Sequence, residues 1–273
     1  MTALIEPWTH GFMQQALLVG LVVAVLSATL SCYVVLKGWS LMGDAVSHAI
    51  LPGVVGAWLL GLPLVLGAFT AGLACALAAG SVRAVSRVKE DAAMGVVFSG
   101  MFAAGLVMLS QVRSDVHLSH VLFGSILGIE TEDLWQTLAI AGTALAILAV
   151  RGRDLLLFCF DPAQARVTGL NTDRLRLLLL VVLAASIVAA VQAVGVILVV
   201  ALLITPGAIG LLMAARFGRM VAFAVGSACL AVVAGIQISF MLNASTAGSI
   251  VVVLSGLFVL ALLASPRHGL LRG

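Results

Sequence analysis

Asp44 and His48 are the residues whose types and spacing most plainly suggest chemistry. They stand four positions apart in LMGDAVSHAILPG, residues 41–53, within an otherwise apolar stretch. On a helix this spacing places both side chains on one face, one above the other. An ionisable residue at the centre of a membrane-spanning helix costs on the order of 3 kcal/mol, so the pair is a candidate functional site.

Three interpretations of this pair stay open from the residues alone. The two side chains could satisfy each other as a structural hydrogen bond, relay protons, or ligate a divalent metal ion in transit, because zinc, manganese and iron accept carboxylate and imidazole ligands. An intramembrane metalloenzyme would need a third ligand and a base, as in H-E-x-x-H, and the sequence has no such motif. The residue types therefore favour metal passage over metal-dependent catalysis.

A second group of potential ligands has the pattern D-x-H-x-x-H. It consists of Asp115, His117 and His120, in a connection between apolar segments. This spacing predicts a metal site at the entrance of a pathway, although histidines in polar loops often have no such role.

The composition of the chain indicates which kind of secondary structure holds these candidate residues. The chain has 273 residues, of which 63% are apolar and 9% charged, whereas a soluble domain has roughly 25% charged residues. Continuous apolar runs without period-two alternation predict membrane-spanning helices. The expected fold class is an all-α, polytopic helical bundle that forms a single transmembrane domain over residues 1–273. The nine expected spans are 12–36, 43–60, 63–82, 92–111, 134–150, 175–192, 194–215, 220–241 and 246–264.

The distribution of Lys and Arg predicts the orientation of the bundle. With nine alternating spans and the N-terminus outside, 13 of the 14 basic residues face the cytoplasm, and only Arg113 lies outside. This agrees with the positive-inside rule. The residues 116–129 are too short and broken to span, and we expect a re-entrant or interfacial helix there.

The largest cytoplasmic connection, residues 151–176, should contain a short helix. Asp161 is a suitable N-cap, Pro162 suits the first helical position, and Gly169 suits the left-handed residue after the helix. A helix this short is marginal in water. It therefore either packs on its own bundle or docks a soluble partner.

Several strings, in this order, resemble the permeases of bacterial ABC importers for zinc, manganese or iron. They are GDAVSHAILPG (43–53), KEDAAMGVVFSGMFAAGLVMLS (89–110), HVLFGSILGI (120–129), FDPAQARVTGLN (160–171), VGVILVVALLITPGA (194–208) and SPRHGLL (265–271). The resemblance runs through nearly the whole chain.

The resemblance implies a homodimeric permease in the bacterial inner membrane, with a fold like that of the vitamin B12 and siderophore importers. Its partners would be cytoplasmic ABC ATPase subunits and a periplasmic or surface metal-binding protein. The chain lacks the Walker A pattern, so ATP would be hydrolysed by the partner. No permanently bound cofactor is expected, and the histidines at the mouth slightly favour zinc over manganese or iron. The alternative function is a proton-coupled secondary transporter that uses Asp44.

The resemblance also assigns roles to residues. Asp44 and His48 match the acid and imidazole that line the metal pathway. The segment 161–171 matches the coupling helix that docks on the ATPase. Its matching residues are Asp161, Pro162, Ala163, Ala165, Gly169, Leu170 and Asn171.

Overall fold

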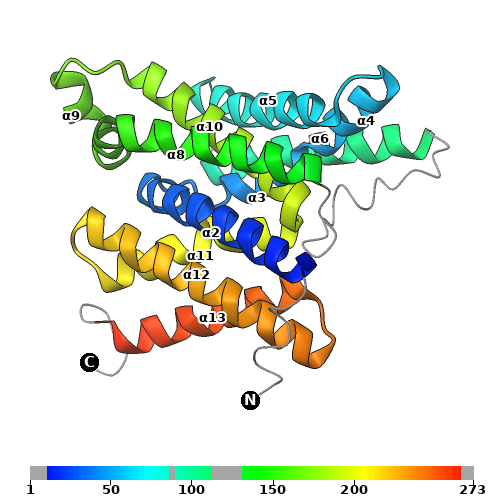
Figure 1. The fold of residues 1–273 in the computed structure, drawn as a ribbon. Coiled ribbons are helices and arrows are strands. Elements are labelled where there is room, and N and C mark those ends of the chain that lie inside the picture. Colours follow the sequence, from blue (N-terminus) through cyan, green and yellow to red (C-terminus); the bar gives the residue numbers. More distant parts are fainter. Residues whose placement is uncertain (1–10, 86–89, 112–130, 266–273) are drawn as a thin grey trace.

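The computed structural model describes residues 11–85, 90–111 and 131–265, and in these ranges every regular element is an α-helix (Figure 1). The helices are α2 (Gly11–Lys37), α3 (Met42–Ala49), α4 (Leu51–Leu59), α5 (Leu64–Val85), α6 (Glu90–Gln111), α8 (Thr131–Phe160), α9 (Pro162–Val167), α10 (Thr172–Val194), α11 (Val196–Met213), α12 (Phe217–Leu242) and α13 (Thr246–Ala264). The all-α expectation is confirmed.

Eight of these helices are long and apolar enough to cross a membrane. They correspond to eight of the nine expected spans. The remaining span, 43–60, is divided into α3 and α4, which have 8 and 9 residues. Pro52 explains the break, because it has no N–H to donate to the carbonyl of His48 one turn earlier.

Helices α2 and α10 form the centre of the bundle, whereas α6, α8 and α13 lie at its edge. Most of the apolar stretch of α2 and α10 is buried, but only 17% of that stretch is buried in α6 and α13. Large apolar side chains such as Val96, Val150 and Val252 are exposed on the outer helices. An apolar exterior of this extent suits contact with lipid rather than with water.

Two glycines allow helices to approach at backbone distance. A Cβ added to Gly53 in α4 would lie 2.0 Å from the carbonyl oxygen of Gly67 in α5, and one added to Gly207 in α11 would lie 2.5 Å from the Ser31 hydroxyl oxygen in α2. Small residues at helix crossings are typical of membrane bundles.

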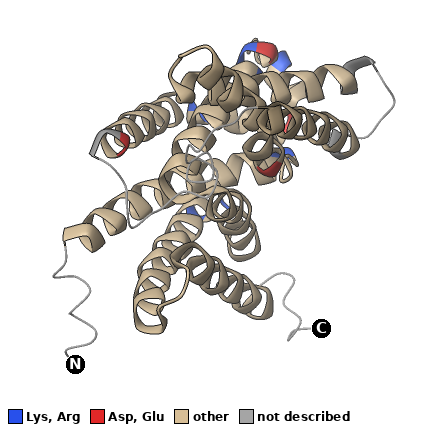
Figure 2. Cartoon of the chain, turned by 90° about the vertical axis from the view of Figure 1, so that its right-hand side faces the viewer, with Lys and Arg blue, Asp and Glu red and all other residues tan. Residues whose placement is uncertain are grey.

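The long helices run roughly parallel to one another, so the bundle has two ends. The end on the left of Figure 1 holds α9, the last turns of α2 and α8, and the connection between α11 and α12. These segments and the first turn of α12 carry Lys37, Arg151, Arg153, Arg166, Arg216 and Arg219. Figure 2 looks at the opposite end, where the described ribbon shows few charged residues.

The connection that we predicted for residues 151–176 begins later in the structure than expected. We expected a span to end near residue 150, but α8 continues as one helix to Phe160. The charges at Arg151, Arg153 and Asp154 end the apolar stretch without ending the helix, because no residue before Pro162 breaks the backbone pattern. The predicted re-entrant segment 116–129 lies outside the described residues.

Candidate functional site

Helix α3 lies in the interior of the bundle, where it packs against α5, α6, α10 and α11. Its apolar residues Ala45, Val46 and Ala49 are fully buried. Gly43 lets α11 approach, since a Cβ there would lie 3.1 Å from a methyl carbon of Leu203. Four neighbouring helices therefore fix the direction in which α3 presents its remaining face.

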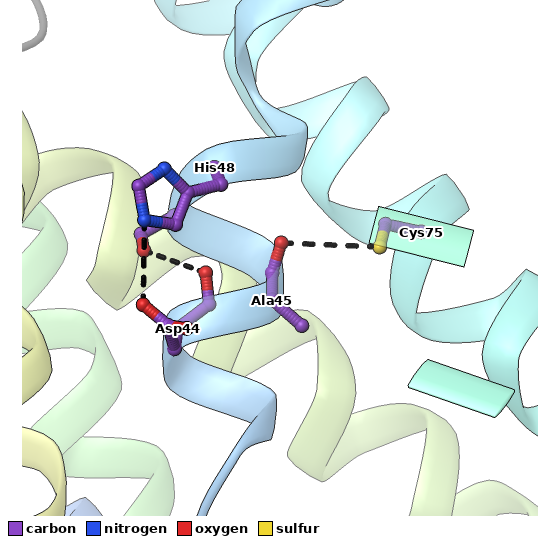
Figure 3. Close-up of polar contacts among 5 residues, drawn as sticks. Asp44, Ala45, His48 and Cys75 are labelled. Carbon is purple, nitrogen blue, oxygen red and sulfur yellow. Dashed lines mark hydrogen bonds and ion pairs between the residues drawn. The ribbon is translucent and has the colours of Figure 1, made fainter. Parts of the chain in front are cut away.

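Asp44 and His48 occupy that remaining face (Figure 3). The Nε2 atom of His48 lies 3.4 Å from Oδ1 of Asp44, and 38% of the His48 side chain and 37% of the Asp44 side chain are exposed in the single chain. On the other side of α3, the Cys75 thiol of α5 contacts the carbonyl oxygen of Ala45 at 4.0 Å. The polar pair thus points away from the packed core toward space that a hydrated ion or a second chain could reach.

Two phenylalanines of α6 contact the imidazole of His48. The His48 ring stacks on Phe98 with centroids 6.3 Å apart and meets Phe102 edge-on at 5.3 Å. Sequence reasoning missed both residues. Their spacing of four positions on one helix face was the available signal, but phenylalanine is ordinary in an apolar helix.

The geometry of the pair is compatible with one shared cation. Two ligand atoms 3.4 Å apart, each about 2.1 Å from an ion, subtend an angle of about 108° at that ion. Within the described residues, no cluster of three or more His, Cys, Asp or Glu side chains forms. One chain therefore offers two ligands here, and water or another chain would supply the rest.

The predicted entrance cluster cannot be placed in the same way. Asp115, His117 and His120 all lie outside the described residues. The entrance site stays a prediction from the sequence.

Helix α9 has the caps that the sequence predicted. The Asp161 carboxylate accepts hydrogen bonds from the backbone N–H groups of Ala163 and Gln164 at 2.9 and 3.0 Å, and Pro162 begins the helix. Gly169 follows the helix with φ of +83°. At the start of α10, the Asn171 side chain accepts a hydrogen bond from the backbone N–H of Arg174.

One face of α9 is anchored and the other is free in the single chain. Ala165 is completely buried against the bundle, and the Nε atom of Arg166 donates to the hydroxyl of Thr172 in α10. In contrast, Val167 is 82% exposed and Phe160, just before the helix, is 78% exposed. The element is thus a firmly held protrusion with exposed apolar side chains at one end of the bundle.

These features define a class, a polytopic helical membrane protein with a polar pair on an interior broken segment and a capped surface helix at its basic end. Comparison with known proteins narrows that class. Residues 9–265 match the ABC 3 transport family, and the chain belongs to it.

Relatives agree with this assignment over nearly the full chain. The chain is 51% identical to the chelated iron transport system membrane protein YfeD of Yersinia pestis, over 94% of this chain and 87% of the relative. It is 47% identical to the manganese transport system membrane protein MntB of Synechocystis, over 98% and 88%. Its fold matches a chain of the PsaBC structure from Streptococcus pneumoniae with a TM-score of 0.87 and 33% identity, covering 97% and 96% of the two chains.

Proposed function

We propose that this chain is the membrane-spanning permease subunit of an ATP-driven importer of manganese or iron ions in a bacterial plasma membrane. The observation that carries the proposal is the identity of about half of all residues with relatives named for manganese and iron transport. The described bundle supports it with eight helices able to span a membrane.

Asp44 and His48 are the proposed ligands along the pathway. An entering ion would exchange part of its water shell for the carboxylate oxygen and the imidazole nitrogen, which already lie 3.4 Å apart. A site with only two protein ligands binds weakly, and weak binding allows an ion in transit to leave. A second copy of the chain would bring the same pair and complete the coordination.

The choice among metals rests on chemistry and on the relatives. Manganese and iron suit a carboxylate with water and one imidazole, and zinc accepts the same ligands. The relatives' names favour manganese and iron over the slight preference for zinc inferred from the outer histidines. Zinc is therefore the competitor ion to include in every uptake measurement.

Helix α9 is the proposed contact with a cytoplasmic ATPase. Its caps hold the helix without a partner, and the exposed Val167 and Phe160 offer apolar side chains for docking. Movement of the ATPase would reach the bundle through α8 and α10, which α9 contacts. A metal-binding protein on the other side would deliver the ion.

Uptake of radioactive manganese by cells that express the complete transporter tests the pathway site. The variant with both Asp44→Ala and His48→Ala should lose at least tenfold in uptake, since no other carboxylate or imidazole joins the pair among the described residues. Asp173→Asn, which changes an exposed carboxylate at the start of α10, serves as the control and should transport normally. Undiminished uptake by the double variant would remove the pair from the pathway.

Reconstitution separates ATP-driven transport from the proton-coupled alternative. In proteoliposomes that contain the permease and its ATPase, uptake should require ATP and should persist with a proton uncoupler. Uptake that the uncoupler abolishes while ATP is present would support proton coupling through Asp44 instead. Competition by iron and zinc in the same vesicles ranks the metals.

A further inference from the structure

A groove at the basic end of the bundle is separate from the Asp44–His48 pair, although its lining includes three residues, Gly169, Leu170 and Asn171, of the segment assigned above to ATPase docking. It is a cavity of about 800 Å³ lined by residues of α8 and α10 and by the segment that joins α9 to α10. All the residues that line it are described. No residue of α3 lines the groove.

The lining of the groove changes from apolar to polar along its length. Thr143, Ile147 and Val150 line it along α8, and Leu178 lines it on α10. Val150 is 80% exposed, although it belongs to an apolar stretch able to span a membrane. The distance from Thr143 to Arg151 along α8 is about 12 Å, close to the thickness of one hydrocarbon leaflet.

The polar end of the groove carries more positive than negative charge. Arg151 and Arg174 line it together with one carboxylate, that of Asp154. The guanidinium of Arg151 lies 3.4 Å from the Asp154 carboxylate, and 59% of the Arg151 side chain stays exposed. The carboxylate therefore orients Arg151 without enclosing it, and a further anion can approach both arginines.

We propose that this groove binds an anionic phospholipid of the cytoplasmic leaflet. The phosphate would lie between Arg151 and Arg174, and an acyl chain would follow Ile147, Val150 and Leu178 into the membrane. Basic pockets between transmembrane helices on the cytoplasmic side suit acidic lipid head groups. The charge at one end and the apolar wall at membrane depth together select a lipid over a soluble phosphate, which would leave the apolar wall uncovered.

The position of the groove gives the lipid a structural effect. Gly169, Leu170 and Asn171 belong to its lining, and they lead directly from α9 into α10. A lipid held there would contact this segment from outside the bundle and would thereby stabilise the position of α9. This inference rests on the bundle lying in a membrane with α9 on the cytoplasmic side, as in the proposed function, but not on which ion is transported.

Native mass spectrometry of the purified transporter tests the proposal. Complexes exchanged into nanodiscs of defined lipid should retain phosphatidylglycerol or cardiolipin in preference to phosphatidylethanolamine. Combining Arg151→Gln with Arg174→Gln should weaken retention about 30-fold, since each arginine near an acidic lipid contributes about fivefold. Ala146→Phe, which fills the apolar part of the groove, should also displace the lipid.

Two control variants distinguish lipid binding in the groove from general effects of charge and side-chain volume on lipid retention. Arg219→Gln removes an exposed arginine at the same end of the bundle, and Ala139→Phe adds bulk to an exposed position on α8 outside the groove. Both should retain acidic lipid as the unmodified chain does. Equal retention in all variants, or equal retention of acidic and zwitterionic lipid, would overturn the proposal.

Two further outcomes would also overturn it. Inorganic phosphate or glycerol phosphate that raises the melting temperature as much as the lipid does would show a soluble anion site. If Ala146→Phe instead separates two copies of the chain without lowering lipid retention, the groove is an interface between copies. Metal uptake is measured separately, so failure of the lipid proposal leaves the transport proposal standing.

Discussion

At the scale of single residues, the contacts of His48 show how the site is held. The imidazole lies 3.4 Å from the Asp44 carboxylate and rests against the rings of Phe98 and Phe102. We infer that the two rings favour the orientation of the imidazole in which one nitrogen lies beside the carboxylate. In the proposed site, α3 would therefore supply the ligands and α6 would position the imidazole.

Replacing Phe102 should weaken the site without removing a ligand. Phe102→Leu loses an aromatic contact worth about 0.5–1.5 kcal/mol, so manganese uptake at low concentration should fall two- to tenfold. Uptake at saturating metal should fall less. Phe223→Leu, at an exposed position on α12, is the control and should have no effect. A loss at saturating metal as large as that at low metal would contradict a positioning role.

The two kinds of site residue differ in how far a sequence can reveal them. Asp44 and His48 are visible because ionisable residues are costly in an apolar segment. Phe98 and Phe102 are invisible because their role depends on α6 packing against α3, and no local pattern encodes that pairing. The exposure of the pair likewise depends on which of the surrounding helices leaves a face uncovered.

At the scale of elements, the N-cap of α9 makes a direct prediction. Asp161→Ala removes the acceptor for the N–H groups of Ala163 and Gln164, at a cost of about 1 kcal/mol. Hydrogen exchange of those two amides should therefore accelerate about fivefold. Asp161→Asn keeps a capping oxygen and should exchange nearly as slowly as the unmodified chain.

The functional consequence of the cap follows from the proposed docking role of α9. ATP-driven uptake should fall in Asp161→Ala and be retained in Asp161→Asn. If both variants lose uptake equally while only one loses the cap, the charge of Asp161 matters rather than the helix that it begins.

The contact between α2 and α11 makes a prediction about stability. The Ser31 hydroxyl donates to the carbonyl of Ile204 and accepts from the N–H of Gly207, on either side of Pro206. Gly207→Ala would place a methyl group 2.5 Å from the Ser31 hydroxyl oxygen, so the helices must separate. We expect a loss of about 1–3 kcal/mol, measured by thermal unfolding in detergent.

A second glycine provides the control for that experiment. A Cβ on Gly226 in α12 would have nothing within 4 Å. Gly226→Ala should therefore be neutral or stabilise by up to about 1 kcal/mol, because alanine favours the helix. Equal destabilisation by both changes would show that the close approach of α2 and α11 does not matter.

The ends of helices were predictable from the sequence where capping or turn residues end the helix. They were not predictable where only a change from apolar to charged residues suggested an end. The cap at Asp161 and the turn at Gly169 agree with the sequence. The end of α8 does not agree, because charges at Arg151 mark where lipid ends while the helix continues. The break in the segment 43–60 comes from Pro52, whose effect the apolar pattern concealed.

At the scale of the whole molecule, the features singled out above lie in different parts of the bundle. The polar pair of α3 lies on an interior broken segment, and the capped helix α9 lies at the basic end, where the amphipathic groove between α8 and α10 also has its charged part. Long central helices such as α10 connect these regions. Because α10 contacts both α9 and α3, a displacement at α9 could reach the Asp44–His48 pair, the proposed ion site, through that helix.

The basic end of the bundle should face the cytoplasm, and impermeant thiol reagents can test this in intact bacterial cells. Ala244→Cys places a thiol in the exposed connection between α12 and α13, and Gln164→Cys places one on α9 at the opposite end. The positive-inside rule predicts that the first variant is labelled in intact cells and the second only after permeabilisation. The unmodified chain sets the background, because Cys32, Cys75 and Cys159 are buried and Cys229 is partly buried. The reverse pattern would place α9 outside, and both the ATPase contact at α9 and the cytoplasmic lipid site would then be untenable.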